Sequence, residues 1–205
     1  MKSKDDHHRR RIKTHLLESS EVKQRVAELC MEPILAAAVL VEKAFCSGGK
    51  VLLCGNGGSA ADCQHMATEL IGRLSKEFER PGLPAIALTT NTSFLTAHSN
   101  DFNFESVFER QVQVLGRPGD VLIGISTSGN SVNIIRAFEA AKAMDISTIA
   151  LTGNQGRLMT LGDVTIAVPS EDTQYIQEAH LAIEHILCEL LERSLFGSEK
   201  GKPGL

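Results

Sequence analysis

Five short apolar stretches, rich in β-branched residues and separated by segments of helical spacing, constrain the fold of this chain more than any other feature. Each stretch is nearly continuous in its hydrophobicity, which is typical of strands that are covered on both faces. Strands that alternate with helices indicate right-handed βαβ units and a largely parallel sheet. The sequence therefore predicts an α/β fold with strands at 50–54, 84–89, 120–125, 147–152 and 163–168, and with helices such as 60–74 and 133–144 between them.

Two long helical stretches flank this predicted core, at 13–46 and 175–196. Pro33 lies within the first stretch and is expected to break or kink it. The second stretch carries apolar residues at i, i+3, i+4 and i+7, and such a stripe has to be buried against another surface. A small sheet needs few covering helices, so we expect either a helical subunit interface or packing within one chain. The stripe consists of Ile176, Ala179, Ile183, Ile186, Leu187 and Leu190.

The length of the chain indicates one domain. Its 205 residues, of which 42% are apolar, suffice for one sizeable core and are too few for two independent ones. No segment is rich enough in Pro, Gly or Ser to act as a linker. We therefore expect a single domain over 13–196, with polar and mobile tails at 1–12 and 197–205.

Charge and cysteine usage narrow the classes of function. A formal net charge of -4 disfavours direct binding to nucleic acid or to an anionic membrane surface. No apolar run approaches the roughly 18 residues that a membrane span requires, and the N-terminus lacks the pattern of a signal peptide. The five widely spaced cysteines suit buried, reduced thiols. We therefore expect a soluble, cytoplasmic protein.

Two glycine- and hydroxyl-rich loops follow predicted strands and precede predicted helices. The first is Gly-Asn-Gly-Gly-Ser at 55–59, and the second is Ser-Thr-Ser-Gly-Asn-Ser at 126–131. In a parallel sheet, ligands bind beyond the carboxyl ends of the strands. Glycines allow close approach, and the helix N-terminus offers free N–H groups to an anion. Because neither loop has the GxxxxGK[ST] pattern, a small phosphate monoester is favoured over a nucleotide.

Each loop also has a purely structural interpretation. The first could be a tight strand-to-helix turn, and the second could supply a helix N-cap. For either loop alone, this interpretation is about as strong as ligand binding. Two such loops at the same end of one sheet favour binding, and the four hydroxyls of the second exceed what one cap can use. They belong to Ser126, Thr127, Ser128 and Ser131.

Several motifs together resemble the sugar isomerase (SIS) domain family, and more narrowly its phosphoheptose isomerase branch. They are GNGGS at 55–59, RPGLPAIAL at 80–88, the Asn100-Asp101 pair, GDVLIGISTSGNS at 119–131 and IQEAH at 176–180. The resemblance extends over about 13–196. It implies the SIS fold, a three-layer αβα sandwich around a five-stranded parallel sheet, and a homotetramer with active sites at the subunit interfaces.

The resemblance also implies a reaction. Members of this branch interconvert sedoheptulose 7-phosphate and D-glycero-D-manno-heptose 7-phosphate, for the synthesis of activated heptose and cell-surface polysaccharide. Zinc is found in the site of several members, so zinc is the expected cofactor, and a phosphorylated heptose is the expected substrate.

Site residues follow from the resemblance position by position. The sugar-binding positions are Asn56, Gly57, Gly58 and Ser59, the phosphate-binding positions are Ser126, Thr127, Ser128 and Ser131, and a ligand-contacting pair is Asn100 and Asp101. The metal and catalytic positions are His65, Glu69, Gln177 and His185, of which Glu69 and Gln177 also contact the substrate. One departure is Gln174, where some isomerases carry an acidic residue.

Aldose–ketose isomerisation requires a base near two adjacent carbons and an acid near their oxygens. We take Glu69 as the base and His185 as the acid, as the family implies. His65 and Glu69 are spaced i, i+4 and share a helix face, although such a pair can also be a solvent-facing contact. His185 could equally be a core or interface histidine that is satisfied by Glu178 or Glu189.

The spacing of the expected metal ligands raises a geometric question. Gln177 and His185 are eight residues apart, which is about 12 Å along one helix. One ion could bind both only if long side chains converge, if the helix begins after Gln177, or if a neighbouring chain completes the site. Whether zinc would be catalytic or inhibitory stays open at this point.

Two other functions are compatible with the fold. The same family includes a tetrameric scaffold that binds a DNA-replication initiator protein, and the chain resembles it in LTTNTSFLTAHSND at 88–101 and LLERSLFG at 190–197. A regulatory sensor of sugar phosphates would keep the phosphate loop and lose the catalytic positions. Because Glu69 and His185 are both retained, the isomerase is favoured over both alternatives.

Overall fold

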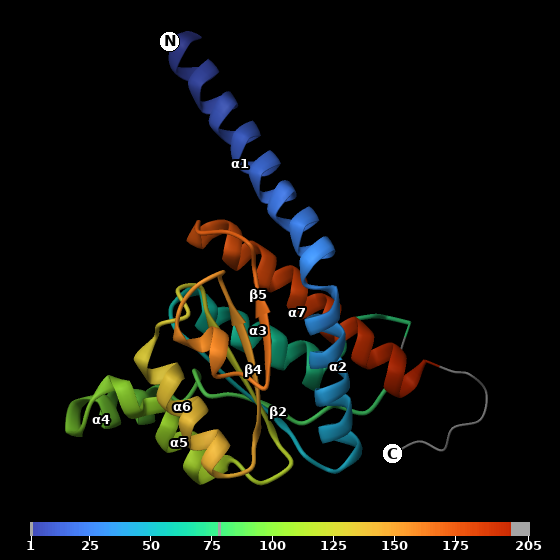
Figure 1. Ribbon diagram of the computed structural model, residues 1–205, viewed down its shortest axis with the longest axis vertical. Helices are drawn as coiled ribbons and strands as arrows, with labels where there is room; N and C mark the ends of the chain where they lie inside the picture. The colour runs from blue at the N-terminus through green and yellow to red at the C-terminus, as the bar shows by residue number, and fades with distance from the viewer. Residues whose placement is uncertain (1, 78, 198–205) are drawn as a thin grey trace.

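The protein is an α/β sandwich in which helices cover both faces of one sheet (Figure 1). A computed structural model describes residues 2–77 and 79–197. Strands and helices alternate through the middle of the chain, as predicted. In order, the elements are α1 (Lys2–Leu29), α2 (Met31–Cys46), β1 (Val51–Gly55), α3 (Gly58–Ile71), β2 (Ala85–Ala87), α4 (Thr92–Asp101), η1 (Phe104–Ser106), α5 (Val107–Leu115), β3 (Val121–Ser126), α6 (Val132–Ala143), β4 (Ser147–Thr152), η2 (Arg157–Thr160), β5 (Val164–Ala167) and α7 (Thr173–Phe196).

The sheet has five parallel strands in the order β2-β1-β3-β4-β5. Val51 at the start of β1 lies opposite Ala85 of β2 on one side and Val121 of β3 on the other. The expected five-stranded parallel sheet is therefore confirmed. β2 is shorter than the predicted stretch 84–89 because only three of its residues pair with β1.

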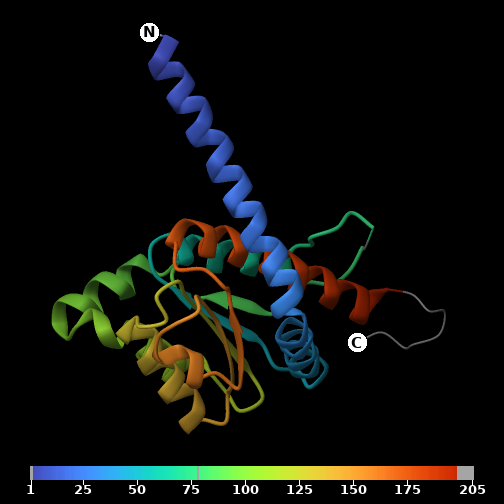
Figure 2. The same cartoon turned by 45° about the horizontal axis from the view of Figure 1, so that its top comes forward.

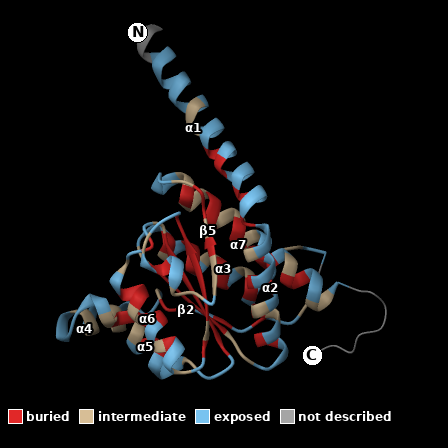
Figure 3. Ribbon diagram, in the orientation of Figure 1, coloured by how far each residue is buried: buried red, intermediate tan, exposed pale blue. Residues whose placement is uncertain are grey.

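Alternating side chains of the strands enter two separate cores, as the two-residue period of a strand requires. Val51 and Leu53 pack into a core that includes buried residues of α2, α3 and α7. Leu52 and Cys54 pack on the opposite face, with buried residues of α5 and α6. Figure 3 shows this pattern as buried strands between helices whose outer faces are exposed. The three-layer αβα sandwich is confirmed.

The long N-terminal helical stretch is divided in two. The break falls at Cys30, and Pro33 lies in the first turn of α2, where its missing N–H is harmless. Residues 2–12, which we expected to form a tail, are helical, and Asp5 and Arg9 form an i, i+4 ion pair in this part of α1. This half of α1 extends away from the body of the fold (Figures 1 and 2). Most of the expected C-terminal tail, 198–205, lies outside the described residues.

The five cysteines are free thiols, as predicted. Four of them are buried, whereas Cys46, at the end of α2, is exposed, so the expectation of burial is wrong for this residue. Burial raises the pKa of the Cys188 thiol to about 12, so this side chain stays protonated and serves as an apolar packing group. Among the described helices, none is both long and apolar enough to cross a membrane.

Candidate functional site

The topology of the sheet marks one place where a ligand is expected. In the strand order β2-β1-β3-β4-β5, the direction of winding reverses between β1 and β3, and ligands bind in the crevice beyond the carboxyl ends of these strands. The first predicted loop connects β1 to α3, and the second connects β3 to α6. Both loops therefore lie at this crevice, as their motifs predict.

A pair of asparagines joins the first loop to the start of α6, directly after the second loop. The Asn56 amide donates to Asn133 Oδ1 and the Asn133 amide donates to Asn56 Oδ1, each at 2.9 Å. Asn133 lies in the first turn of α6 and is buried. Asn133 was not among the predicted site residues, because nothing in the local pattern shows that it pairs with a residue 77 positions earlier.

The first loop presents the N-terminus of α3 without a capping side chain. Gly57 is the N-cap, with a φ of 58° that favours glycine, and no side chain among the described residues bonds to the first N–H groups of the helix. Gly58 lies directly against the side-chain amide of Gln177, so that a Cβ at this position would overlap it. Ser59, the next residue of α3, is buried. The helix N-terminus is therefore open to an anionic or hydroxyl-bearing ligand.

The second loop gathers serine hydroxyls above α6. Ser126 Oγ lies 3.0 Å from Ser131 Oγ and 3.4 Å from Ser128 Oγ. Ser131 occupies the N-cap position, yet its hydroxyl makes no capping bond to the helix backbone. The carbonyl of Thr127 accepts a hydrogen bond from the Gly153 N–H, which fixes the loop against the end of β4. This geometry disfavours the interpretation of the loop as a simple N-cap.

Helices α3 and α7 bring three of the predicted residues together. Nε2 of His65 lies 2.8 Å from Nε2 of His185, and the ring centroids are 5.0 Å apart. Oε1 of Glu69, one turn after His65 on α3, lies 3.8 Å from the same His65 nitrogen. The side chain of His65 is 40% exposed and that of Glu69 is 19% exposed, so a ligand can reach the cluster.

The partner of His185 differs from both structural alternatives. Glu178 bonds to His15 and Ser19 of α1, and Glu189 accepts a hydrogen bond from Arg193. The interpretation of His185 as a histidine satisfied by either glutamate is therefore wrong, and His65 is its neighbour instead.

Gln177 does not join this cluster. Because α7 begins at Thr173, Gln177 is already helical, and its Nε2 donates to Oδ2 of Asp62 at 3.0 Å. The possibility that the helix begins after Gln177 is thus excluded. Asp62, which lies on α3 one turn before His65, was not among the predicted site residues. In the described part of the chain, no group of three or more His, Cys, Asp or Glu side chains is arranged to hold a metal ion.

The donor types around His65 nevertheless suit zinc. On a tetrahedral zinc ion with Zn–N bonds of about 2.0 to 2.1 Å, two ring nitrogens lie about 3.3 Å apart. The observed separation between His65 and His185 is 2.8 Å, so a displacement of about half an ångström would open the pair to an ion. The carboxylate of Glu69 supplies a third donor of a type that zinc accepts. Gln177 stands outside this set.

Three ionisable side chains are buried behind the cluster. Burial, and secondarily the charge of Asp62, raise the pKa of Glu184 to about 9, so it is protonated at neutral pH. Burial lowers the pKa of His180 to about 4, although its bond to the carbonyl of Thr152 acts in the opposite direction. Burial also raises the pKa of Asp62, while the hydrogen bond from Gln177 lowers it. The i, i+4 pair His180 and Glu184 of α7 belongs to this buried layer.

The remaining predicted positions lie at the periphery. Asn100 and Asp101 are exposed at the end of α4, where the Asn100 amide donates to Asp101 at 2.9 Å. α4 projects from the edge of the fold and buries none of its residues (Figure 1). Within the described residues, no hydrogen bond joins the pair to the α3–α7 cluster. Gln174 lies in the first turn of α7, where its N–H donates to the N-cap Asp172.

Comparison with known proteins identifies the family of this chain. Residues 15–153 match the family model of the SIS domain. A phosphoheptose isomerase from Aquifex aeolicus is 53% identical over 89% of this chain and 95% of its own length. A phosphoheptose isomerase from Roseiflexus is 49% identical over 96% of this chain and 99% of its own length.

A solved structure extends the likeness to three dimensions. The phosphoheptose isomerase of Neisseria gonorrhoeae superimposes with a TM-score of 0.84 at 45% identity, covering 90% of this chain and 98% of that one. Sequence and fold thus agree over nearly the whole length of both proteins. The chain is an isomerase that belongs to the SIS domain family and, within it, to the phosphoheptose isomerases.

Proposed function

We propose that this sugar-phosphate isomerase converts sedoheptulose 7-phosphate to D-glycero-D-manno-heptose 7-phosphate, in the cytoplasm, for activated heptose and cell-surface polysaccharide. The observation that carries the proposal is the approach of His65 and His185 across α3 and α7, with Glu69 beside them. An imidazole and a carboxylate supply the acid and the base that a shift of a carbonyl group along a sugar requires. The names of the relatives supply the heptose.

The phosphate of the substrate is assigned to the second loop. The hydroxyls of Ser126, Ser128 and Ser131 lie within hydrogen-bond distance of one another, so one anion can accept bonds from several of them. Thr127 adds a fourth hydroxyl, and the N-terminus of α6 adds its dipole. Across the crevice, Asn56 to Ser59 and the amide of Gln177 are assigned to the sugar hydroxyls.

Glu69 is assigned as the base that removes a proton from C1 of the ketose and returns it to C2. The resulting enediol needs a proton to move between O1 and O2, and His185 is assigned as the acid that handles it. His65 lies between the two groups and can hold the ring of His185 in one orientation through the Nε2 contact.

Zinc is proposed as a cofactor held by His65, Glu69 and His185, with Gln177 as a fourth ligand only if its side chain leaves Asp62. When bound, zinc would polarise the sugar oxygens and stabilise negative charge on them. The same three side chains would then be engaged by the ion, so adding zinc can raise or lower turnover, and the assay below distinguishes the two effects.

A homotetramer with sites between subunits is proposed from the surface of α1, α2 and α7. An apolar groove of about 330 Å³ runs between these helices, and Met31, Leu35 and Ile186 on its walls are exposed in the single chain. The projecting half of α1 exposes further apolar side chains, including Leu16. Such surfaces are typical of subunit interfaces. A neighbouring subunit could then bring Asn100 and Asp101 to the site.

The test of this function is a turnover assay. Purified protein is incubated with sedoheptulose 7-phosphate, with added zinc and with a chelator, and aldose formation is followed by NMR. We expect conversion in at least one of the two conditions. No conversion in either would overturn the proposal.

No observation favours the scaffold for a replication initiator or the sugar-phosphate sensor.

A further inference from the structure

A buried ion pair lies near the C-terminal ends of α3 and α7, the two helices that carry the candidate base and acid. Nε of Arg80, in the connection between α3 and β2, lies 2.9 Å from Oε1 of Glu192 on α7. Both side chains are only 1% exposed. Two charges so deeply buried need further hydrogen bonds to compensate for the loss of water.

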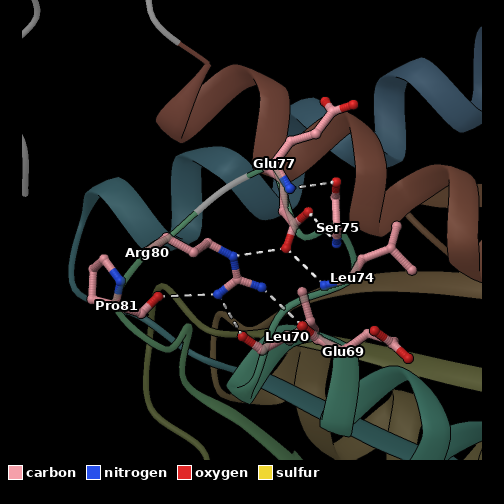
Figure 4. A network of polar contacts seen from close by, with 8 residues as sticks. Glu69, Leu70, Leu74, Ser75, Glu77, Arg80 and Pro81 are labelled. Atoms are coloured by element: carbon pink, nitrogen blue, oxygen red, sulfur yellow. Dashed lines mark hydrogen bonds and ion pairs between the residues drawn. The ribbon is translucent and has the colours of Figure 1, made fainter.

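Arg80 finds these bonds at the C-terminal end of α3. Its Nη2 donates to the carbonyl of Glu69 at 2.8 Å, and its Nη1 donates to the carbonyls of Leu70 at 2.9 Å and Pro81 at 3.0 Å. The last four carbonyls of a helix lack partners within the helix, and an arginine can satisfy them. Figure 4 shows the guanidinium of Arg80 against this turn, with the carboxylate of Glu69 directed away from it.

Glu192 completes the arrangement from the side of α7. Its Oε1 accepts from the N–H of Leu74 at 2.8 Å and its Oε2 from the N–H of Ser75 at 3.0 Å, so the chain that leaves α3 is also fixed. The guanidinium of Arg80 in addition lies 5.7 Å from the ring centre of Phe196, near the end of α7. We call this arrangement of Arg80 and Glu192 the α3–α7 clamp.

The clamp contacts α3 and α7 close to the candidate base and on the helix face of the candidate acid. Arg80 bonds to the backbone of Glu69 itself, the candidate base. Glu192 lies seven residues after His185, which is two turns along the same face of α7. The clamp therefore sets the height and rotation of the turn that carries Glu69 relative to the helix that carries His185.

Stability alone does not account for a buried ion pair. Replacing such a pair with apolar residues of similar size is often neutral or stabilising, whereas the ionic pair with its directed bonds favours one geometry. Arginine suits this role because its planar fork reaches several acceptors at once, which a lysine cannot do.

We propose that Arg80 and Glu192 are positioning residues for catalysis, which hold Glu69 at the distance from His65 and His185 that proton transfer requires. The proposal rests on the function proposed above, because it assigns a role in that reaction. It predicts that weakening the clamp lowers kcat while the substrate, held by the loops at the crevice, still binds with nearly unchanged KM.

The experiment compares three variants with the wild type. Arg80→Lys keeps the charge and loses the fork, Glu192→Gln keeps the shape and loses the charge, and the double variant Arg80→Met/Glu192→Leu removes both charges without leaving one unpaired. Asp120→Asn is the matched control, since Asp120 is equally buried, pairs with Lys50 and accepts backbone bonds, but lies where β3 begins, at the opposite end of the sheet.

Turnover of sedoheptulose 7-phosphate and thermal unfolding are measured for each protein. We expect kcat to fall at least tenfold in the double variant and severalfold in Arg80→Lys, with KM within twofold of the wild type. Asp120→Asn should lose thermal stability and keep its kcat. Wild-type kcat in both Arg80→Lys and the double variant, or a loss of kcat in Asp120→Asn of the same size, would overturn the proposal.

A second readout keeps this test separate from that of the proposed function. The imidazole nitrogen shifts of His185, recorded by NMR on protein labelled with 15N-histidine, report its contact with His65 whether or not the chosen sugar reacts. We expect them to move in the Arg80→Lys and double variants and to stay at wild-type values in Asp120→Asn. Unchanged His185 shifts in both clamp variants would contradict the positioning role. If the wild type does not convert sedoheptulose 7-phosphate but the His185 shifts still move in the clamp variants, the proposed substrate is wrong and the positioning role stands.

Discussion

The side-chain amides of Asn56 and Asn133 donate to each other at 2.9 Å across the crevice between β1 and β3. Asn56 belongs to the first loop, and Asn133 is buried in the first turn of α6, directly after the second loop. The pair therefore fixes the distance between the loop assigned to the sugar and the loop assigned to the phosphate. A ligand that spans both loops depends on that distance.

Replacing Asn133 with Ala should weaken both folding and substrate binding. The change leaves the half-buried amide of Asn56 without its partner, which costs about 1 kcal/mol in the free energy of unfolding. We expect a lower Tm and a KM raised severalfold, measured by thermal unfolding and by the turnover assay. Gln113→Ala, on the exposed face of α5, is the control and should change neither. A wild-type KM in Asn133→Ala would show that substrate binding does not depend on the asparagine pair.

Replacing Gly58 with Ala should displace the amide of Gln177. The added methyl group would overlap that amide, which is the end of a flexible side chain and can move without unfolding the protein. We expect at least a tenfold loss of kcat/KM with a nearly unchanged Tm. Gln177→Ala should have a similar effect, and the double variant should lose little more than either single one. Fully additive losses would mean that the two positions act independently.

The fold was predictable from the sequence because its determinants are local. Strands buried on both faces are continuous in hydrophobicity, so the stretch 147–152 was predicted with the same bounds that β4 has in the structure. The start of α1 was not predicted, because the polar composition of 2–12 suggested a tail. Polar side chains are compatible with a helix that stands clear of the core, and only the structure distinguishes the two.

The candidate site was predictable only in part. Motifs identified the loops and the residues on α3 and α7, and i, i+4 spacing identified the shared face of His65 and Glu69. The bonds that position them join residues far apart in the chain, as in Asp62 with Gln177 and Arg80 with Glu192. Their register depends on how two helices pack, which neither composition nor spacing reveals.

Stability should depend on pH through His180. Its pKa is about 4 in the folded protein and about 6.5 when unfolded, so the unfolded chain binds more protons between these values. The contribution of His180 to the free energy of unfolding is complete above pH 6.5. It is lost as the pH falls toward 4, and the free energy of unfolding then decreases by up to about 1.4 kcal/mol per pH unit.

Comparison with a His180→Gln variant isolates this effect. Glu184 acts in the opposite direction, since its pKa is about 9 in the folded protein and 4.5 ordinarily. Its contribution to the free energy of unfolding is therefore lost as the pH rises from 4.5 to about 9. Chemical unfolding of both proteins at several pH values between 4 and 7 gives the difference in slope. We expect the wild type to lose more stability than the variant on acidification, and equal slopes would show that His180 is not protected from protonation.

A charge placed in the apolar groove should prevent self-assembly. Ile186 on α7 is 41% exposed in the single chain and lines the groove between α1, α2 and α7. In Ile186→Glu, a carboxylate would have to be buried without a partner if a second copy covers the groove. Light scattering after size exclusion should give the mass of a tetramer for the wild type and a smaller assembly for the variant. A monomeric wild type would refute the assembly.

The central claim is that Glu69 moves the carbon-bound proton, and exchange of that proton tests it most directly. Wild-type protein and Glu69→Gln are incubated with sedoheptulose 7-phosphate in D2O, with Glu139→Gln, an exposed glutamate on α6, as the control. We predict that NMR shows aldose formation and deuterium incorporation with the wild type and the control, and at least a thousandfold slower reaction with Glu69→Gln. Turnover and exchange by Glu69→Gln at the wild-type rate would contradict the account.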